Sequence, residues 1–365
     1  MTKYVNPTQS DSDAIFLGWQ KTLEGDSFPM FNVTAADHPF FRSTVTGATL
    51  RKLNLRVPQT PSPYLETPPA LWNELGIALN HPRTAREAIQ TAGLDYTVVT
   101  KPLGSKTGLK QEAYATIRAD NGDILGVVSE NYKPVQNIDA FTFFDSLVAA
   151  DEAVYETAGI LGKGECVWIL AKLPGFINVH GGDIVNKYIL LTNGHAGGSR
   201  VRLQINPIRA ICNNTLTAAL QGAGDISIYH QPNVAWTSQQ AATMMIMTNV
   251  LHEELDIVFN AMAARSITGQ QLREYVQALV PDDEESHNTA NTEKIRASVL
   301  QLHDSGRGAD LARGTVWGAW NCVAEYTDHL MPDEDSTLRL NSIWFGRSEQ
   351  LKAKAFRLAK SMLHS

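Results

Sequence analysis

Arginines recur at every second position at the start of the segment 199–211. Arg200 and Arg202 alternate with apolar residues, so an extended strand would place both guanidinium groups on one face. Pro207 then shifts the phase, and Arg209 follows. A glycine-rich turn at residues 193–199 precedes the strand and would let backbone N–H groups approach an anion. The pattern predicts a strand that contacts phosphate groups.

Two lysines and an aromatic ring could extend this surface. Lys163 lies in the turn of a predicted hairpin, and Lys172 lies near the end of its second strand. Tyr188, or Trp168 as an alternative, would offer a flat ring on which a base stacks. Proteins that bind single strands combine such rings with a cationic groove. The competing interpretation is a half-solvated strand behind a flexible turn, without a ligand.

A second group of polar residues shares one side of a predicted helix at residues 315–330. Glu325, Asp328 and His329 fall within about one helical turn of each other. Carboxylates and an imidazole can bind a hard metal ion or act as a general base. The chain has no H-E-x-x-H or paired-carboxylate motif to complete such a site. Hydrogen bonds to a neighbouring element explain these residues better, so we expect no metal and keep a metal-dependent hydrolase only as an alternative.

Three cysteines, Cys166, Cys212 and Cys322, lie far apart in the chain. Their spacing excludes a disulfide framework and a zinc site built mainly of cysteines, and it favours a reducing cytoplasm. Cys212 ends a predicted strand, where we interpret it as a small core residue rather than a nucleophile. The apolar stretches are much shorter than the roughly 20 residues of a membrane span, and the start carries no apolar signal region. We therefore expect a cytoplasmic protein without a membrane partner.

The composition is that of a globular protein. The chain has 365 residues, of which 43% are hydrophobic and 19% charged. These fractions exclude a mainly disordered, collagenous or coiled-coil chain. The net charge is −7, from 31 cations and 38 anions, which argues against a broad surface for duplex DNA. Acidic residues concentrate in spacers at residues 282–285 and 333–335, so a narrow cationic groove is compatible with the acidic total.

Hairpins dominate the middle of the chain. Residues 113–119 and 124–128 flank an Asn-Gly turn, and residues 154–161 and 166–173 flank a turn with two glycines. This pattern predicts an α+β fold, with an antiparallel sheet of hairpins and packed helices. Further elements complete the region: a helix at about 138–148 capped by Asn137, strands at 187–192, 200–211 and 226–230, and a short helix near 215–220.

The regions on either side of this core differ from it. Residues 1–100 predict an irregular N-terminal arm, with an extended proline-rich linker at 57–69 and short helices at 72–79 and 83–92. Residues 101–233 would form the α+β core. Residues 234–365 predict a mostly helical region packed on this core, with helices at about 238–264, 268–279, 292–302, 315–330 and 347–363.

The last predicted helix is basic. It carries five lysines and arginines against one acid, Glu349, which gives a net charge of +4. The helix could touch DNA or an acidic neighbour. A solvated helix face is nevertheless the commoner role of such a run of charges.

Short strings occur in a fixed order along the chain. They include Gly126-Val127-Val128-Ser129, Tyr155-Glu156-Thr157-Ala158-Gly159, Leu190-Leu191-Thr192-Asn193, Asn213-Asn214-Thr215-Leu216, Gly314-Thr315-x-Trp317 and Trp344-Phe345-Gly346. This ordered set resembles the phage/plasmid-like protein family built around domain of unknown function 932, from about residue 15 to the C-terminus. The family offers no catalytic residues to carry over. Its occurrence on phages, prophages and plasmids implies DNA metabolism or interaction with host defence.

The order of hairpins and helix around a basic strand also looks like the core of Rad52-type single-strand annealing proteins, at the level of the fold. This similarity implies a homo-oligomeric ring or filament that binds single-stranded DNA without nucleotide hydrolysis. The leading hypothesis is a binding protein rather than an enzyme, without a cofactor. The alternatives are a non-catalytic protein that acts on host defence and the hydrolase described above. The residues expected to contact DNA are Arg200, Arg202, Arg209, Lys172, Lys163 and Tyr188.

Overall fold

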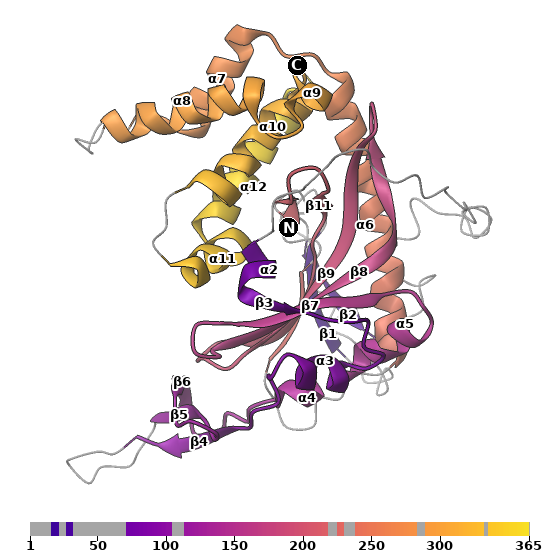
Figure 1. Ribbon diagram of the computed structural model, residues 1–365, viewed down its shortest axis with the longest axis vertical. Helices are drawn as coiled ribbons and strands as arrows, with labels where there is room; N and C mark the ends of the chain where they lie inside the picture. Colours follow the sequence, from indigo (N-terminus) through magenta and orange to yellow (C-terminus); the bar gives the residue numbers. More distant parts are fainter. Residues whose placement is uncertain are drawn as a thin grey trace.

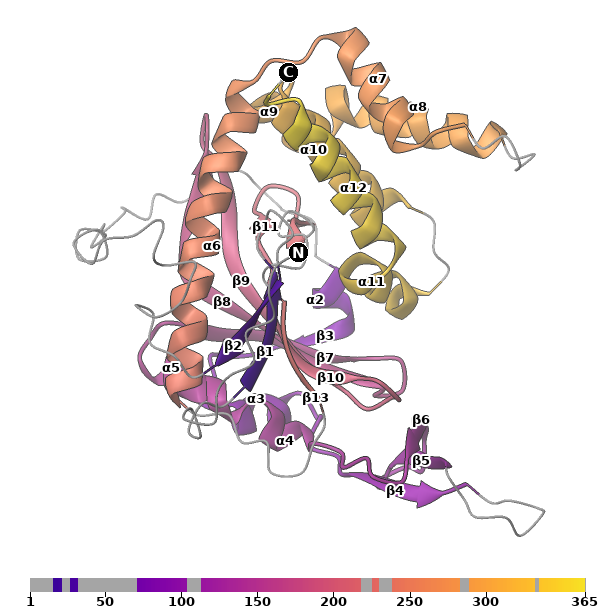
Figure 2. The ribbon, with the colours of Figure 1, turned by 180° about the vertical axis from the view of Figure 1, so that it is seen from behind.

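The computed structural model describes residues 16–21, 27–31, 71–103, 113–217, 225–229, 238–282, 289–331 and 335–364. The proline-rich linker predicted at 57–69 lies outside these residues. A large antiparallel sheet occupies the centre, with the long helix α6 (Ser238–Ala264) along one side and the C-terminal helices on the other (Figure 1 and Figure 2). The predicted α+β class, with antiparallel hairpins followed by a mostly helical C-terminal region, is confirmed.

The large sheet is built mainly from consecutive hairpins. Eight strands of the described residues take part, in the pairing order β12-β11-β9-β8-β7-β3, and β10 lies between β9 and β13. Short turns with glycines at positive φ, such as Gly162 and Gly198, reverse the chain between neighbouring strands. The strands are β3 (Gly76–Ala78), β7 (Val154–Leu161), β8 (Cys166–Val179), β9 (Asp183–Gly194), β10 (Arg200–Ile205), β11 (Ile208–Arg209), β12 (Asn214–Thr215) and β13 (Asp225–Tyr229).

A smaller three-stranded sheet projects from one end of the molecule (Figure 1). It consists of β4 (Val98–Pro102), β5 (Ala113–Arg118) and β6 (Ile124–Ser129), all antiparallel. The predicted Asn-Gly turn joins β5 to β6, as the hairpin pattern indicated. A separate hairpin pairs β1 (Phe16–Lys21) with β2 (Ser27–Phe31).

Helices account for most of the C-terminal region. Within the described residues, no helix is both long enough and apolar enough to cross a membrane. In chain order the helices are α2 (Leu71–Leu75), α3 (Ala85–Thr91), α4 (Asn137–Ala140), η2 (Thr142–Phe144), α5 (Asp145–Ala149), α6, α7 (Gly269–Leu279), α8 (Thr289–Ser305), α9 (Ala309–Ala312), α10 (Val316–Glu325), the π-helix η4 (Tyr326–Leu330), α11 (Ser336–Phe345) and α12 (Arg347–Ser361).

Successive side chains along each strand point to opposite sides, so the large sheet has two faces with different residues. On one face, Ile169, Leu191 and Leu203 are buried with residues of α3, α5 and the first part of α6. On the other face, Trp168 and Leu190 pack against α2 and α11. A third cluster joins the far ends of β8 and β9 to α6, α7, α10 and α12. The sheet is therefore covered on both sides, but by different parts of the chain.

The first difference from the sequence prediction lies at the start of the core. The helix predicted at 72–79 ends at Leu75, and the chain continues as β3 beside β7. Glycine permits this approach, because a Cβ on Gly76 would lie 2.5 Å from the ring of Trp168. Part of the predicted N-terminal arm therefore belongs to the large sheet.

Two predictions near residue 210 also need correction. The strand predicted at 200–211 ends at Ile205, since Pro207 cannot donate to the ladder, and it resumes as β11. The helix predicted at 215–220 is wrong at its start, where β12 pairs with β11 instead. Residues 218–220 lie outside the described part of the chain. Asn213 has a φ of 55°, a conformation that asparagine tolerates, and this turns the chain back.

Two helical predictions differ in detail from the structure, and one helix was not predicted. The helix predicted at 138–148 consists of the short pieces α4, η2 and α5, and its cap residue is Gln136 rather than Asn137. The helix predicted at 315–330 widens into the π-helix η4 in its last turn. The helix α11 was not expected at all, although Asp335 caps it through bonds to two backbone N–H groups.

The buried histidine of α6 makes stability depend on pH. Burial, helped by Lys187, lowers the pKa of His252 from 6.5 to about 3. Below about pH 6.5, His252 therefore binds a proton in the unfolded chain but stays neutral in the folded chain. We expect the free energy of unfolding to fall as the pH is lowered from about 7 to about 5, by up to about 1.4 kcal/mol per pH unit from this residue. Urea denaturation at each pH should show a flatter decrease for His252→Gln, and an equally steep decrease would contradict this account.

Candidate nucleic-acid interface

The two arginines of β10 lie on the sheet face that α11 covers. Arg202 pairs with Thr192 of β9, and Thr192 pairs with Trp168 of β8, so these side chains point to the same face. Trp168 is buried there against Trp344 of α11, with ring centroids 5.2 Å apart. Arg200 and Arg202 are themselves half-buried. The two guanidinium groups therefore share one face of the sheet, next to a helix.

Phe345, the last residue of α11, lies over the same place. Its ring centroid is 5.9 Å from the guanidinium carbon of Arg202, within the range of a cation–π contact. The half-buried ring packs edge-on against Trp344, at 6.2 Å between centroids, which anchors it. Arg200 is held from the other side, where its Nη1 donates to Ser227 Oγ at 3.1 Å. Two cations and one partly exposed ring thus meet on a rigid support.

Lys163 lies at the same end of the sheet. Cys166 of β8 pairs with Gly194 of β9, and Arg200 begins the strand on the other side of β9. Cys166 and Arg200 are therefore about two strand spacings apart, roughly 10 Å. Lys163 is exposed in the turn that leads into Cys166. Of the residues predicted to contact DNA, the structure brings three to this end of the sheet: Lys163, Arg200 and Arg202.

A fourth cation, Arg118 of β5, holds this turn in place. Its Nη1 donates to the carbonyl oxygen of Lys163 at 2.9 Å, and its guanidinium carbon lies 3.8 Å from the ring centroid of Tyr96. Asp120 accepts from Nε and Nη2 of Arg118 and offsets its charge. Sequence reasoning did not single out Arg118, because nothing local indicates that β5 reaches the turn between β7 and β8.

The glycine-rich turn between β9 and β10 has a packing role. A Cβ on Gly197 would lie 2.3 Å from the carbonyl oxygen of Val127, so only glycine lets the turn approach β6 this closely. His195 is buried at the base of the turn, with Nε2 2.8 Å from Asn137 Oδ1. Gly197 therefore serves this contact between the two sheets.

Lys172 and Tyr188 lie farther along the same face and form a separate group. They are partners in the register of β8 and β9, and Lys172 Nζ lies 5.8 Å from the ring centroid of Tyr188. Lys172 Nζ is also 4.0 Å from Glu156 Oε1, a surface pair of small energetic value. Tyr188 is only 8% exposed and Trp168 is 0% exposed. Neither ring is exposed enough to stack on a base, so the structure does not support the stacking role predicted for Tyr188.

Arg209 lies inside the protein. It is 2% exposed, and its Nη2 lies 2.7 Å from Asp183 Oδ2, while its Nε contacts both carboxylate oxygens. Nη2 also donates to the carbonyl oxygen of Gly308, and Trp317 Nε1 donates to Asp183 Oδ2 at 2.8 Å. A guanidinium enclosed in this way cannot reach a phosphate. The prediction that Arg209 contacts DNA is therefore wrong. The residues next to Arg209 in the sequence do not indicate this, because its partner Asp183 lies 26 residues earlier in the chain.

Asp328, one of the three residues considered for a metal, belongs to a buried ion pair. Its Oδ1 accepts from Lys352 Nζ at 2.7 Å, and both side chains are almost fully buried. Its Oδ2 accepts from the backbone N–H of Thr215 at 2.7 Å and from the hydroxyl of Thr215 at 2.8 Å. The carboxylate is thus fully used to join α12 and η4 to β12.

Glu325 and His329 turn to other partners. Both oxygens of Glu325 accept from the backbone N–H of Arg307, and burial raises the pKa of this carboxyl. His329 Nε2 lies 3.1 Å from Asn214 Oδ1, and burial lowers the pKa of the imidazole. Among the described residues, no three His, Cys, Asp or Glu side chains gather where they could hold a metal ion. This part of the chain gives the metal-dependent hydrolase no support.

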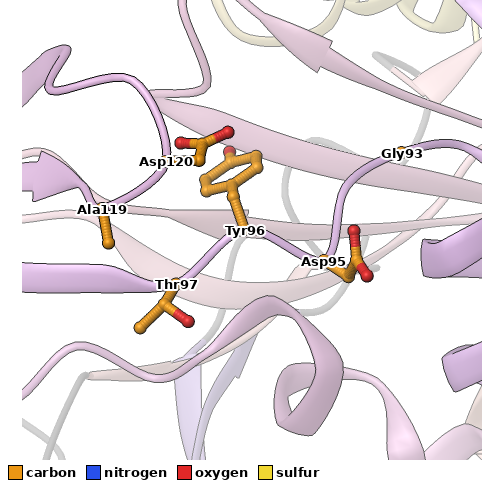
Figure 3. Close-up of a pocket in the computed structure, with 6 residues that line it drawn as sticks. All are labelled: Gly93, Asp95, Tyr96, Thr97, Ala119 and Asp120. Atoms are coloured by element: carbon orange, nitrogen blue, oxygen red, sulfur yellow. The ribbon is translucent and has the colours of Figure 1, made fainter.

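An open depression of about 420 Å³ lies beside the small sheet (Figure 3). The carboxylates of Asp95 and Asp120 lie on either side of the Tyr96 ring. Burial raises the pKa of the Tyr96 hydroxyl to about 12, so this group stays neutral. A polar, shallow and acidic lining suits neither a phosphate nor an apolar small molecule. The depression is lined by Gly93, Asp95, Tyr96, Thr97, Ala119 and Asp120.

Comparison with known proteins places the chain in a family. A family model described as domain of unknown function (DUF932) matches residues 124–362, which is more than half of the chain. The chain belongs to the DUF932 family. The match begins within β6, later than the start near residue 15 expected from the sequence strings, and it includes the large sheet from β7 onward and the C-terminal helices. No curated protein and no solved structure matches the chain.

The sequence did not single out Phe345 of this DUF932 protein, the half-buried ring beside Arg202. Its signal was present in the string Trp344-Phe345-Gly346, two aromatic residues followed by the glycine between α11 and α12. One ring enters the core and the next stays half-exposed beside Arg202. Because α11 itself was not predicted, the string had no place in the expected fold.

Breaking the buried pair should destabilise the protein strongly. In Lys352→Met, Asp328 would keep its charge in the interior without a cation, and such losses cost about 3–5 kcal/mol. Arg357→Met removes the same kind of charge from the exposed side of α12 and should change stability by only about 0.5 kcal/mol. Urea denaturation monitored by tryptophan fluorescence measures both. Equal effects of the two substitutions would show that the pair is unimportant.

Proposed function

We propose that this DUF932 protein binds single-stranded DNA at the β10 surface, defined as Arg200, Arg202, Lys163 and Phe345. The observation that supports the proposal most is the joint position of two half-buried arginines and a half-buried aromatic ring on one sheet face. Secondary structure supports each of these side chains, so the surface is preformed. Lys163 lies at the edge, where it adds charge.

The residue types suit a single strand better than a duplex. Guanidinium groups recognise phosphate through several N–H donors, and a ring such as that of Phe345 can stack on any base. In a duplex the base faces are hidden in the stack, and affinity comes from a wide set of phosphate contacts. The small number of cations at the β10 surface and the net charge of −7 agree with a narrow strand.

We further propose that binding serves strand annealing in the recombination of mobile elements, in the cytoplasm. The support is the resemblance to the phage/plasmid-like family and the fold-level similarity to Rad52-type annealing proteins. The similarity to annealing proteins of that type implies a homo-oligomer that needs no nucleotide hydrolysis. The described residues are consistent with this, since the groups expected for hydrolysis are engaged in internal hydrogen bonds.

The β10 surface can be tested by substitution. We expect Arg200→Ala combined with Arg202→Ala to weaken binding of fluorescently labelled oligo(dT). The slope of log K against log salt should decrease by about 1.4, because each phosphate contact on a single strand contributes about 0.7. Fluorescence anisotropy at several salt concentrations measures both quantities. Phe345→Leu should weaken binding by about 1–3 kcal/mol per stacked base and leave the salt slope unchanged.

A matched control removes two exposed cations elsewhere. Arg86→Ala with Lys294→Ala changes the net charge equally, on α3 and α8, and should bind as the unmodified protein does. If the Arg200 and Arg202 variant binds no more weakly than this control, the β10 surface is not the binding site.

Particle size tests the annealing part separately. We expect a homo-oligomer whose mass is a multiple of the 40.1 kDa chain, enlarged or ordered by oligo(dT). Mass photometry with and without the oligonucleotide gives the answer. A monomer under both conditions would contradict a ring or filament, although binding at the β10 surface could still hold.

A further inference from the structure

The outer side of α12 carries a basic stripe. Five residues are spaced by alternating steps of three and four, which places them on one side of a helix with 3.6 residues per turn. None of the five is acidic and none is a large apolar residue. They are Arg347, Gln350, Lys354, Arg357 and Ser361, and we call them the α12 stripe.

The packing of α12 fixes the direction of this stripe. The opposite side of the helix is buried against α10, η4 and α7, and it includes the buried Lys352. Because that side faces inward, the stripe faces outward, and Arg347 and Arg357 are exposed. Lys354 is only half-buried, but its Nζ donates to the carbonyl oxygen of Leu279 at 2.8 Å. The two arginines are therefore the accessible cations of the stripe.

The stripe continues from the β10 surface. Arg347 follows Phe345 by two residues, so their Cα atoms lie within about 8 Å of each other. Phe345 in turn lies 5.9 Å from Arg202. From Arg347 to Arg357 the helix rises by about 15 Å, away from the corner between α11 and α12. Figure 2 shows α12 running from this corner toward the C-terminus.

We propose that the α12 stripe is a second segment of the DNA interface, along which a single strand continues after it passes Arg202 and Phe345. This inference rests on the proposed function. The stripe suits phosphates better than a protein partner, because protein interfaces centre on apolar and aromatic residues and the stripe has none. The stripe also begins where the β10 surface ends, so the phosphates of one continuous DNA strand could contact both. A short strand would occupy only the β10 surface, and a longer one would reach both.

Oligonucleotide length separates the two segments. We propose to measure binding of oligo(dT) of about 6 and about 25 nucleotides by fluorescence anisotropy, with the full chain. Arg347→Gln combined with Arg357→Gln should leave the short strand unaffected. For the long strand it should lower affinity and reduce the salt slope by about 1.4, from two lost contacts. Arg86→Gln with Lys294→Gln removes the same charge from α3 and α8 and should affect neither length.

The possible outcomes distinguish this inference from the proposed function. If the Arg347 and Arg357 variant binds both lengths normally, while the Arg200 and Arg202 variant binds both weakly, the stripe is not part of the interface and the proposed function stands. If neither variant loses affinity, both proposals fail. If the Arg347 and Arg357 variant keeps its affinity but changes its sedimentation as an oligomer, the stripe contacts another copy of the chain, and this inference is overturned.

Discussion

The buried pair between Lys352 and Asp328 is the interaction on which the arrangement of the C-terminal helices depends. It joins α12 to η4, and through Thr215 it ties both to the β11–β12 hairpin at the edge of the large sheet. An ammonium and a carboxylate leave water only when each finds a partner, so the helix has little freedom to slide along its axis. Gly346 joins α12 directly to α11, whose last residue, Phe345, lies beside Arg202.

The second buried pair, Arg209 with Asp183, shows how the chain divides its charges between structure and surface. Both pairs lie where sheet meets helices, and Trp317 and the carbonyl oxygen of Gly308 complete the surroundings of the second one. Cations used in this way add nothing to a binding surface. Among the described residues, Arg200 and Arg202 lie on β10 and the exposed Arg347 and Arg357 lie on α12, while other exposed cations, such as Arg86 and Lys294, lie on other elements. A net charge of −7 is therefore compatible with the proposed binding of a single strand at a local group of cations.

Sequence patterns predicted the elements well where neighbouring residues alone determine the local structure. Alternation placed Arg200 and Arg202 on one face, and helical spacing gave the bounds of α6. The failures share a different cause, which is contact between residues distant in the chain. Nothing near Arg209 indicates the carboxylate of Asp183, and nothing near Gly76 indicates the ring of Trp168 that turns an expected helix into a strand. Phe345 was missed for the same reason, because its neighbour Arg202 lies on a strand more than a hundred residues earlier in the chain.

Ultraviolet cross-linking of oligo(dT) to the full chain, followed by mass spectrometry of the digested product, tests the central claim most directly. It reports which residues the bases touch without altering the protein. The account predicts cross-linked peptides that contain Phe345 and the residues of β10, and with a long oligonucleotide additional peptides from α12. Cross-links that spare these peptides and concentrate elsewhere, for example on α8 or around the depression beside Tyr96, would contradict it.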